Sequence, residues 1–409
     1  MLNPTEKLLL ECVRSSAEDR PKGSSKKLFM EAVDIDWQLL AGQGFKVFLP
    51  FFLEINEFSK SLEIPVETEE IIKIKYISNI AKNEKIKKLI LKIAREFNKA
   101  KVDLIFLKGA ALLFTLYKDD SGVRSLADLD ILTKKENISE AEDILRNIGC
   151  REDYEKLSIR ENIVLSRKHY AKRHFHYVYF IDDILIELHW DISNNTNPEI
   201  LASLFHASKK VTVNDVALRI LSPEHSIFIL CINFSRDFNE IFSRLRPEIK
   251  NIKTEMFCRI LYFLYEIKIM LRYYKDTISW DNLLSLAHSS KNEYVLYVFL
   301  LLAQKIVKAD IPQVVMDKIR SHPGISLYSF LYRNTNYEAI IKLYFYKDLL
   351  KLTDYRSFIG DPVKMAKSVY ASMLSYLHVS YPEAFTYLIK RLTMQAIESD
   401  NALNSKKGD

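Results

Sequence analysis

The chain has 409 residues, 48% of them hydrophobic, which is enough for packed cores in two or three domains. Its net charge of +6 comes from 59 basic and 53 acidic residues mixed along the sequence, so no dense cationic arm indicates nucleic-acid binding. With only 9 Gly and 11 Pro, the composition favours long helices over a turn-rich β architecture.

Cysteine usage and hydropathy indicate where the protein works. The four cysteines lie far apart and form no CxxC pair, which argues against a zinc knuckle and against a disulfide framework. The N-terminus lacks a basic segment followed by an apolar one, and the longest apolar run, residues 294–303, is too short to span a bilayer. We therefore expect a soluble, cytoplasmic protein without a membrane partner.

Helical spacing dominates the first 98 residues, which are predicted to form an N-terminal helical region. Apolar residues recur at intervals of three and four near its end, at Ile86, Leu89, Ile90, Ile93 and Phe97. We interpret the lysines between them as a solvated helix face; a basic binding surface is the less favoured alternative.

The pattern changes after residue 98. A nearly continuous apolar run at 102–107 is typical of a buried strand, and residues 110–117 are predicted to form a helix. Lys108 and Gly109 are thereby predicted to form a strand-to-helix turn. A second strand is predicted at 129–133, and a helix follows it up to Gly149.

Three further strands are predicted at 157–166, 174–181 and 184–191. In the last of these, the even-numbered positions are apolar, whereas Glu187 and His189 project from the other face. One face of this strand is thus predicted to be core and the other to carry chemistry.

These elements predict an α+β fold, with a small mixed-sheet core flanked by N- and C-terminal helical regions. The core is predicted at 99–222, a C-terminal helical domain at 223–400 and a frayed tail at 401–409. Within the C-terminal helices, Ser279 is a predicted N-cap.

Asp128 and Asp130 are the first candidates for a functional site. Two aspartates at i and i+2 on a strand point to the same face, where they can hold divalent ions with hard oxygen ligands. A solvated turn would be the ordinary explanation of an isolated pair. Here the preceding strand ends at a glycine that opens a helix, so backbone N–H groups and the positive helix end could face a polyphosphate.

Lys108, Gly109 and Arg124 are the candidate phosphate-binding residues. Gly109 would let the backbone approach a phosphate, and Lys108 would bring an ammonium group to it; the alternatives are simple turn geometry and a solvent-facing lysine. Arg124 could contact a phosphate, or the molecule that accepts the transferred group if the site catalyses a transfer. A surface ion pair is an equal alternative.

Glu187 is the candidate third carboxylate. An acid inside an apolar strand is costly unless it meets a metal or a cation, so a metal ligand is favoured over a structural ion pair. His189 could orient Glu187, bind the acceptor or only form a hydrogen bond in the core, and the structural role is favoured. A zinc site is not expected in the cluster of His169, Arg173, His174 and His176, since no Cys or third ligand stands nearby.

Four stretches together resemble a known family: 106–113 (FLKGAALL), 122–124 (GVR), 128–132 (DLDIL) and 186–190 (IELHW). They are similar to the motifs of a largely uncharacterised bacterial nucleotidyltransferase family, over about residues 100–222. The resemblance implies a DNA polymerase β-like core in which Asp128 and Asp130 bind magnesium and Glu187 completes the acidic set. It also implies that Lys108-Gly109 replaces the superfamily's Gly-Ser turn, and that Asn233 stands where the family has a histidine.

The resulting hypothesis is a nucleotidyltransferase that uses Mg²⁺, with Mn²⁺ as a substitute. It would move a nucleoside monophosphate from a nucleoside triphosphate, expected to be ATP, to a hydroxyl or amine of a small molecule or peptide, releasing pyrophosphate. Its catalytic and metal-binding residues would be Asp128, Asp130 and Glu187. The alternatives are a non-catalytic nucleotide-sensing or protein-interaction module and, with thinner support from the lysine-rich helix, a nucleic-acid end-modifying transferase.

Overall fold

A computed structural model describes residues 3–15, 34–55, 64–161, 166–168, 171, 175–192, 196–244, 252–290 and 292–320. Contacts along the chain group residues 1–232 and 254–317 into one compact unit. The remaining residues form a second unit. In the described part of the chain, no helix is long and apolar enough to cross a membrane.

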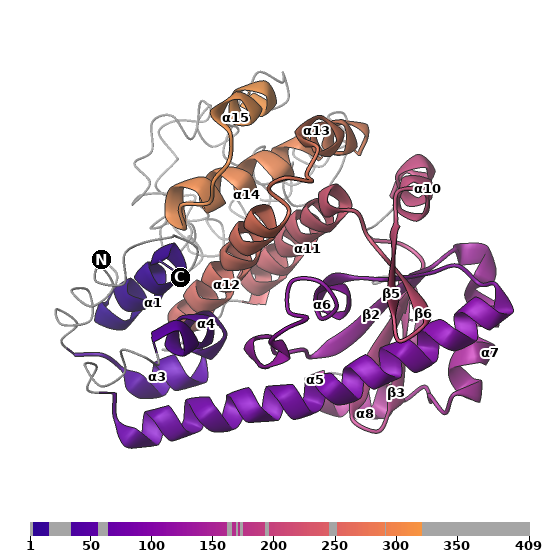
Figure 1. Ribbon diagram of the computed structural model, residues 1–409, viewed down its shortest axis with the longest axis horizontal. Coiled ribbons are helices and arrows are strands. Elements are labelled where there is room, and N and C mark those ends of the chain that lie inside the picture. The colour runs from indigo at the N-terminus through magenta and orange to yellow at the C-terminus, as the bar shows by residue number, and fades with distance from the viewer. Residues whose placement is uncertain are drawn as a thin grey trace, which may run out of the picture. The chain divides into compact units, whose positions relative to one another are not determined.

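The first unit is built around one six-stranded mixed sheet (Figure 1). Its strand order is β3-β4-β2-β1-β6-β5; β2 pairs with β4 and β1 with β6 in parallel, and the other pairs are antiparallel. The strands are β1 (Leu104–Phe106), β2 (Asp128–Thr133), β3 (His176–Ile181), β4 (Ile184–His189), β5 (Lys209–Val213) and β6 (Val216–Ile220). The predicted α+β class with a small mixed sheet is confirmed.

Helices precede and follow the strands, as predicted. Before the sheet lie α1 (Pro4–Ser15), α3 (Trp37–Gly42), α4 (Phe45–Ile55) and α5 (Val66–Ala100). Between the strands lie α6 (Lys108–Leu112), the 3₁₀ helices η2 (Ser121–Val123) and η3 (Lys135–Asn137), α7 (Ile138–Asn147), α8 (Tyr154–Glu161) and α10 (Pro198–His206). After them come α11 (Pro223–Arg244), α12 (Ile252–Tyr273), α13 (Trp280–Ser289), α14 (Glu293–Ile306) and α15 (Gln313–Arg320).

The 35-residue helix α5 is the long helix that runs beside the sheet in Figure 1. The five apolar positions that predicted it, Ile86, Leu89, Ile90, Ile93 and Phe97, are all buried. The N-cap predicted at Ser279 is confirmed as well. Its side chain accepts a hydrogen bond from the backbone N–H of Asn282 at the start of α13.

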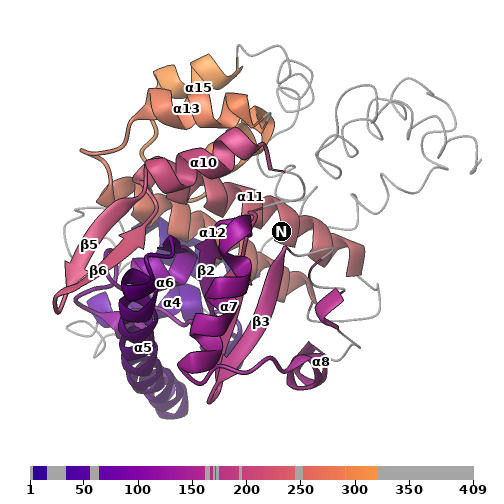
Figure 2. The same ribbon diagram turned by 90° about the vertical axis from the view of Figure 1, so that its right-hand side faces the viewer.

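Helices cover the two faces of the sheet, and Figure 2 shows α7 and α8 next to β3. On one face, the Tyr179 hydroxyl donates to Glu142 of α7. On the other, Leu157 of α8 packs against Val178, Phe180 and Leu185. Because Leu185 and Glu187 lie two residues apart on β4, the face that α8 covers at one end also carries Glu187.

The strand predicted at 157–166 is wrong over residues 157–161, which are helical and belong to α8. Asp153 accepts a hydrogen bond from the backbone N–H of Lys156 at 2.7 Å, the bond that an N-cap makes at a helix start. Leu157 is buried, but Ile159 is 75% exposed, so alternate residues do not share a buried face. Residues 162–165 lie outside the described part of the chain.

The hairpin of β5 and β6 was not predicted. Its turn consists of Asn214 and Asp215, whose φ angles are 47° and 61°. Two successive positive φ angles are typical of the two-residue turns that match strand twist, and Asn and Asp tolerate them best among residues with side chains. The Asn-Asp pair followed by the alternating apolar residues of β6 was the signal in the sequence.

Candidate active site

The strand register brings the predicted carboxylates together. In the parallel pairing of β2 with β4, Asp130 lies opposite Glu187; in the antiparallel pairing of β3 with β4, His176 lies opposite His189. Asp128 shares a face with Asp130, because the two residues are two apart on β2. Three neighbouring strands thus supply the site.

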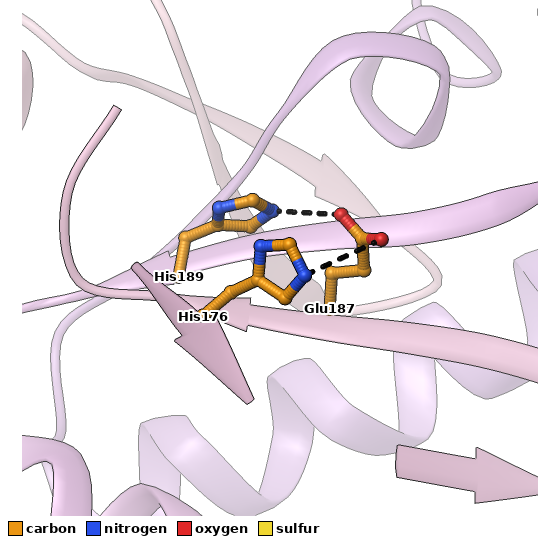
Figure 3. Close-up of side chains that lie close together, drawn as sticks. All are labelled: His176, Glu187 and His189. Carbon is orange, nitrogen blue, oxygen red and sulfur yellow. Dashed lines mark hydrogen bonds and ion pairs between the residues drawn. The ribbon is translucent and has the colours of Figure 1, made fainter. Parts of the chain in front are cut away.

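The side chains form a connected cluster. Lys108 Nζ donates to Asp130 Oδ1 at 2.7 Å, and His189 Nε2 lies 3.0 Å from the same oxygen. His189 Nε2 also lies 3.2 Å from Glu187 Oε2, and His176 Nε2 lies 3.6 Å from Glu187 Oε1. Figure 3 shows both imidazole rings directed at the Glu187 carboxylate.

The two aspartates of the cluster differ in how their charge is balanced. Burial, together with repulsion from Asp130 and Glu187, raises the pKa of Asp128 to about 7. Burial would also raise the pKa of Asp130, but Lys108 and the hydrogen bond from His189 hold it below its usual value. Asp130 is thus a stable anion, while Asp128 carries the unrelieved repulsion.

The Glu187–histidine pairs keep the third carboxylate charged. Burial would raise the pKa of Glu187, but His176 and His189 hold it well below its usual value. Burial would in turn lower the pKa of His189, whereas its bonds to Asp130 and Glu187 raise it. The buried acid therefore persists as a carboxylate that faces two imidazoles.

Lys108, the first residue of α6, has a left-handed conformation, with a φ of 46°. A lysine in this region is strained by about 1 kcal/mol or more, so surrounding structure must hold it there. At Gly109, an added Cβ would lie 2.1 Å from Leu126 Cδ2 and 3.2 Å from Arg124 Nη2. The loop before β2 thus requires this glycine, and α6 itself has only five residues.

Arg124 is engaged by a helix that follows the core. Its Nη1 donates to the Tyr262 hydroxyl and to Glu266 Oε1, both on α12, and its guanidinium carbon lies 5.3 Å from the centroid of the Tyr262 ring. The side chains of Arg124 and Glu266 are only 11% and 4% exposed. Arg124 thus forms an ion pair that is buried rather than on the surface, and its contact with a phosphate stays a prediction.

The sequence did not single out Tyr262, Glu266 or Lys46. Lys46 of α4 lies with its Nζ 5.3 Å from the centroid of the Tyr262 ring, which adds an exposed cation beside Arg124. Because these three residues come from segments far from the motifs in the sequence, no local pattern could have found them.

His176 was named in the sequence but judged not to bind metal, because no third ligand stood nearby. That reason is wrong: the donor atoms of His176, Glu187 and His189 all lie within 4.8 Å of one another. The predicted strand at 174–181, paired with its neighbour, was the signal that could have joined them. The other cluster members, His169, Arg173 and His174, lie outside the described residues.

The family of uncharacterised nucleotidyltransferases has a model that matches residues 34–308 of this sequence. The match spans more than half of the chain and includes the whole sheet. The chain belongs to this family and is a nucleotidyltransferase by class, an enzyme that transfers nucleoside monophosphates.

A search of curated proteins finds no match to this sequence. Among solved structures, a crystal structure of ANT(2")-Ia in complex with adenylyl-2"-tobramycin is similar, with 14% identity, a TM-score of 0.29, and coverage of 51% of this chain and 98% of that chain. A solution structure of ANT(2'')-Ia is similar at 13% identity and a TM-score of 0.30, covering 53% of this chain and 96% of that one. At these TM-scores, the likeness adds nothing to the family assignment.

Proposed function

We propose that the chain transfers a nucleoside monophosphate from a nucleoside triphosphate, with ATP as the expected donor, to a hydroxyl or amine of a small molecule or peptide. The observation that carries the proposal is the acidic cluster on β2 and β4, in which Asp130 lies opposite Glu187 and beside Lys108. Asp128 and Asp130, with Glu187, are its proposed catalytic residues. The cytoplasmic location and a bacterial origin stay predictions.

The cluster fits a bound magnesium ion by its donor chemistry. Hard carboxylate oxygens are the ligands that Mg²⁺ prefers, and Asp128, Asp130 and Glu187 supply them from adjacent strand positions. Burial and repulsion from the neighbouring acids raise the pKa of Asp128, and a bound cation would lower it again. When bound, Mg²⁺ supplies a positive charge that neutralises the phosphates and favours in-line attack on the α-phosphate.

Lys108, Glu187 and Arg124 have separate roles in the proposed reaction. Lys108 is 27% exposed, so its ammonium group can hold a phosphate oxygen while staying close to Asp130. The low pKa of Glu187 favours a role as a charged ligand over a role as a proton acceptor. Arg124, tied to Glu266, positions the loop that leads into Asp128.

The experiment that tests this function follows pyrophosphate release with the full-length chain. Each nucleoside triphosphate is supplied with Mg²⁺ and with metabolite or peptide pools, and the acceptor is identified by its gain in mass. Asp128→Asn should abolish turnover, whereas Glu142→Gln, on the opposite face, should retain it. Unchanged turnover in Asp128→Asn would refute the assignment.

Calorimetry separates the enzyme from a non-catalytic module. A transferase should bind a nucleoside triphosphate with an affinity that depends on Mg²⁺, and Asp130→Asn should remove that dependence. Nucleotide binding without metal dependence would favour a sensing module instead.

A further inference from the structure

Two buried histidines stand beside Glu187, and the proposed transfer assigns them no role. His176 and His189 are each 5% exposed, and their rings lie 4.5 Å apart between centroids. They form a direct cross-strand pair of β3 and β4, so the sheet fixes their separation. Figure 3 shows that both rings approach the same carboxylate.

The donor atoms of the three residues lie close enough together to hold one small ion. Zinc lies about 2.0–2.1 Å from its nitrogen and oxygen ligands, which separates neighbouring ligand atoms by about 3.3 Å. His189 Nε2 lies 3.2 Å from Glu187 Oε2, and His176 Nε2 lies 3.6 Å from the other carboxylate oxygen, Oε1. The ligand atoms of the three residues all lie within 4.8 Å of one another.

The donor types favour a transition metal over magnesium. Imidazole nitrogen suits zinc and its first-row neighbours, whereas Mg²⁺ takes oxygen ligands and keeps much of its water. Two imidazoles with one carboxylate is also a ligand set that zinc enzymes use, with the next position left to water or substrate. A set of carboxylates alone would not favour zinc over magnesium in this way.

We propose that His176, Glu187 and His189 bind one Zn²⁺ ion, with the fourth position left to water or substrate. This zinc position shares Glu187 with the proposed magnesium ligands, whereas Asp128 and Asp130 belong to the magnesium ligands only. At one end of the cluster, the imidazoles on β3 and β4 would bind zinc. At the other end, the carboxylates at the start of β2 would bind magnesium. Zinc binding here does not require the transfer reaction.

The experiment titrates Zn²⁺ into the full-length chain after chelator treatment, without nucleotide and in a large excess of Mg²⁺. The wild type should bind one Zn²⁺ that Mg²⁺ does not displace. His176→Gln and His189→Gln should each weaken this binding at least about tenfold, because each removes one ligand. Co²⁺ in place of zinc should give the strong visible absorption of a four-coordinate ion, and both variants should reduce it.

Three controls make the outcome specific. His206→Gln changes an exposed histidine at the end of α10 and should leave Zn²⁺ affinity unchanged. Asp128→Asn should also keep zinc binding, although it should abolish transfer. Thermal melting of each variant checks the fold, and His176→Gln, which lies farther from Asp130, serves if His189→Gln fails to fold.

Zinc affinity that is the same in the wild type and both histidine variants would overturn the zinc site, as would displacement of Zn²⁺ by Mg²⁺ from the wild type. Neither result bears on nucleotidyl transfer, which is measured separately through Asp128.

Discussion

Two buried carboxylate clusters lie on opposite faces of the same sheet, and they differ in what neutralises them. On one face, Asp130 and Glu187 meet a lysine and two histidines. On the other face, Glu142 Oε1 lies 2.7 Å from Arg167 Nη2 and accepts a hydrogen bond from the Tyr179 hydroxyl at 2.5 Å. The first cluster belongs to the candidate site, and the second ties α7 to β3.

The difference teaches how a structural cluster can be told from a functional one. A guanidinium is always charged and forked, so the arginine-paired Glu142 is neutralised whatever binds to the protein. The site cluster keeps unrelieved repulsion, since the pKa of Asp128 is raised to about 7 by burial and by two neighbouring acids. This uncompensated charge supports the proposal that the cluster binds a cation.

The largest effect should come from removing one site carboxylate. Asp130→Asn should lower the rate of pyrophosphate release at least about a thousandfold, because it removes a metal ligand and the partner of Lys108. Glu142→Gln should leave the rate within a few-fold and should lower the unfolding free energy instead. Steady-state kinetics and urea denaturation of both variants measure this contrast. An equal loss of activity in the two variants would contradict the distinction between a functional and a structural cluster.

Replacing the lysine of the site should have the next largest effect. Lys108→Met should lower kcat/KM for the nucleoside triphosphate about a hundredfold, which is the scale of losing one charged group that stabilises a transition state. The matched change on the other face, Arg167→Met, should leave kcat/KM unaltered. A Lys108→Met enzyme with wild-type kcat/KM would show that this cation serves only the fold.

The pH dependence of stability should separate the clusters as well. The folded-state pKa of Asp128 is raised from its ordinary 3.8 to about 7, so the folded chain favours the protonated acid. Its contribution to the unfolding free energy therefore falls as pH rises from about 4 to 7. Between pH 5 and 8 the metal-free wild type should lose about 2 kcal/mol relative to Asp128→Asn.

Chemical denaturation in the presence of a chelator measures that loss, and added Mg²⁺ should restore the stability at pH 8. If the wild type and Asp128→Asn show parallel curves, the repulsion at Asp128 is absent.

The smallest effect should come from the structural cluster. Tyr179→Phe removes one hydrogen bond to Glu142, which keeps Arg167 as its partner, so the unfolding free energy should fall by about 1 kcal/mol. The rate of transfer should stay unchanged. A loss of activity in Tyr179→Phe would mean that both faces of the sheet serve the reaction.

Much of the sheet could be predicted from local pattern. The alternation after Ile184 predicted β4, and the run that ends at Leu107 predicted β1. The strand predicted at 157–166 was wrong over residues 157–161, where the chain is helical and the apolar Ile159 faces solvent, which alternation alone cannot reveal. The β5–β6 hairpin has exposed, lysine-rich residues in its first strand, so its apolar signal was weak.

The site was predictable only in part, because its partners are distant in the sequence. Asp130, Glu187 and Lys108 were named from motifs, and the structure brings them together; their roles stay predictions. The contact of Arg124 with Glu266 spans 142 residues, and no periodicity encodes a pairing at that range. The motifs predicted which charged residues belong to the site, but only the tertiary packing determines which of them contact partners far away in the sequence.

The Arg124–Glu266 pair also limits how the protein can be cut for expression. A fragment of residues 99–222 would contain Arg124 but neither Glu266 nor Tyr262, and it would lack Asn83, whose amide donates to the Arg124 carbonyl. Losing one partner of a buried ion pair costs about 3–5 kcal/mol, a large share of the roughly 5–15 kcal/mol that holds a domain folded. A fragment that keeps all of these contacts runs from α5 through α12.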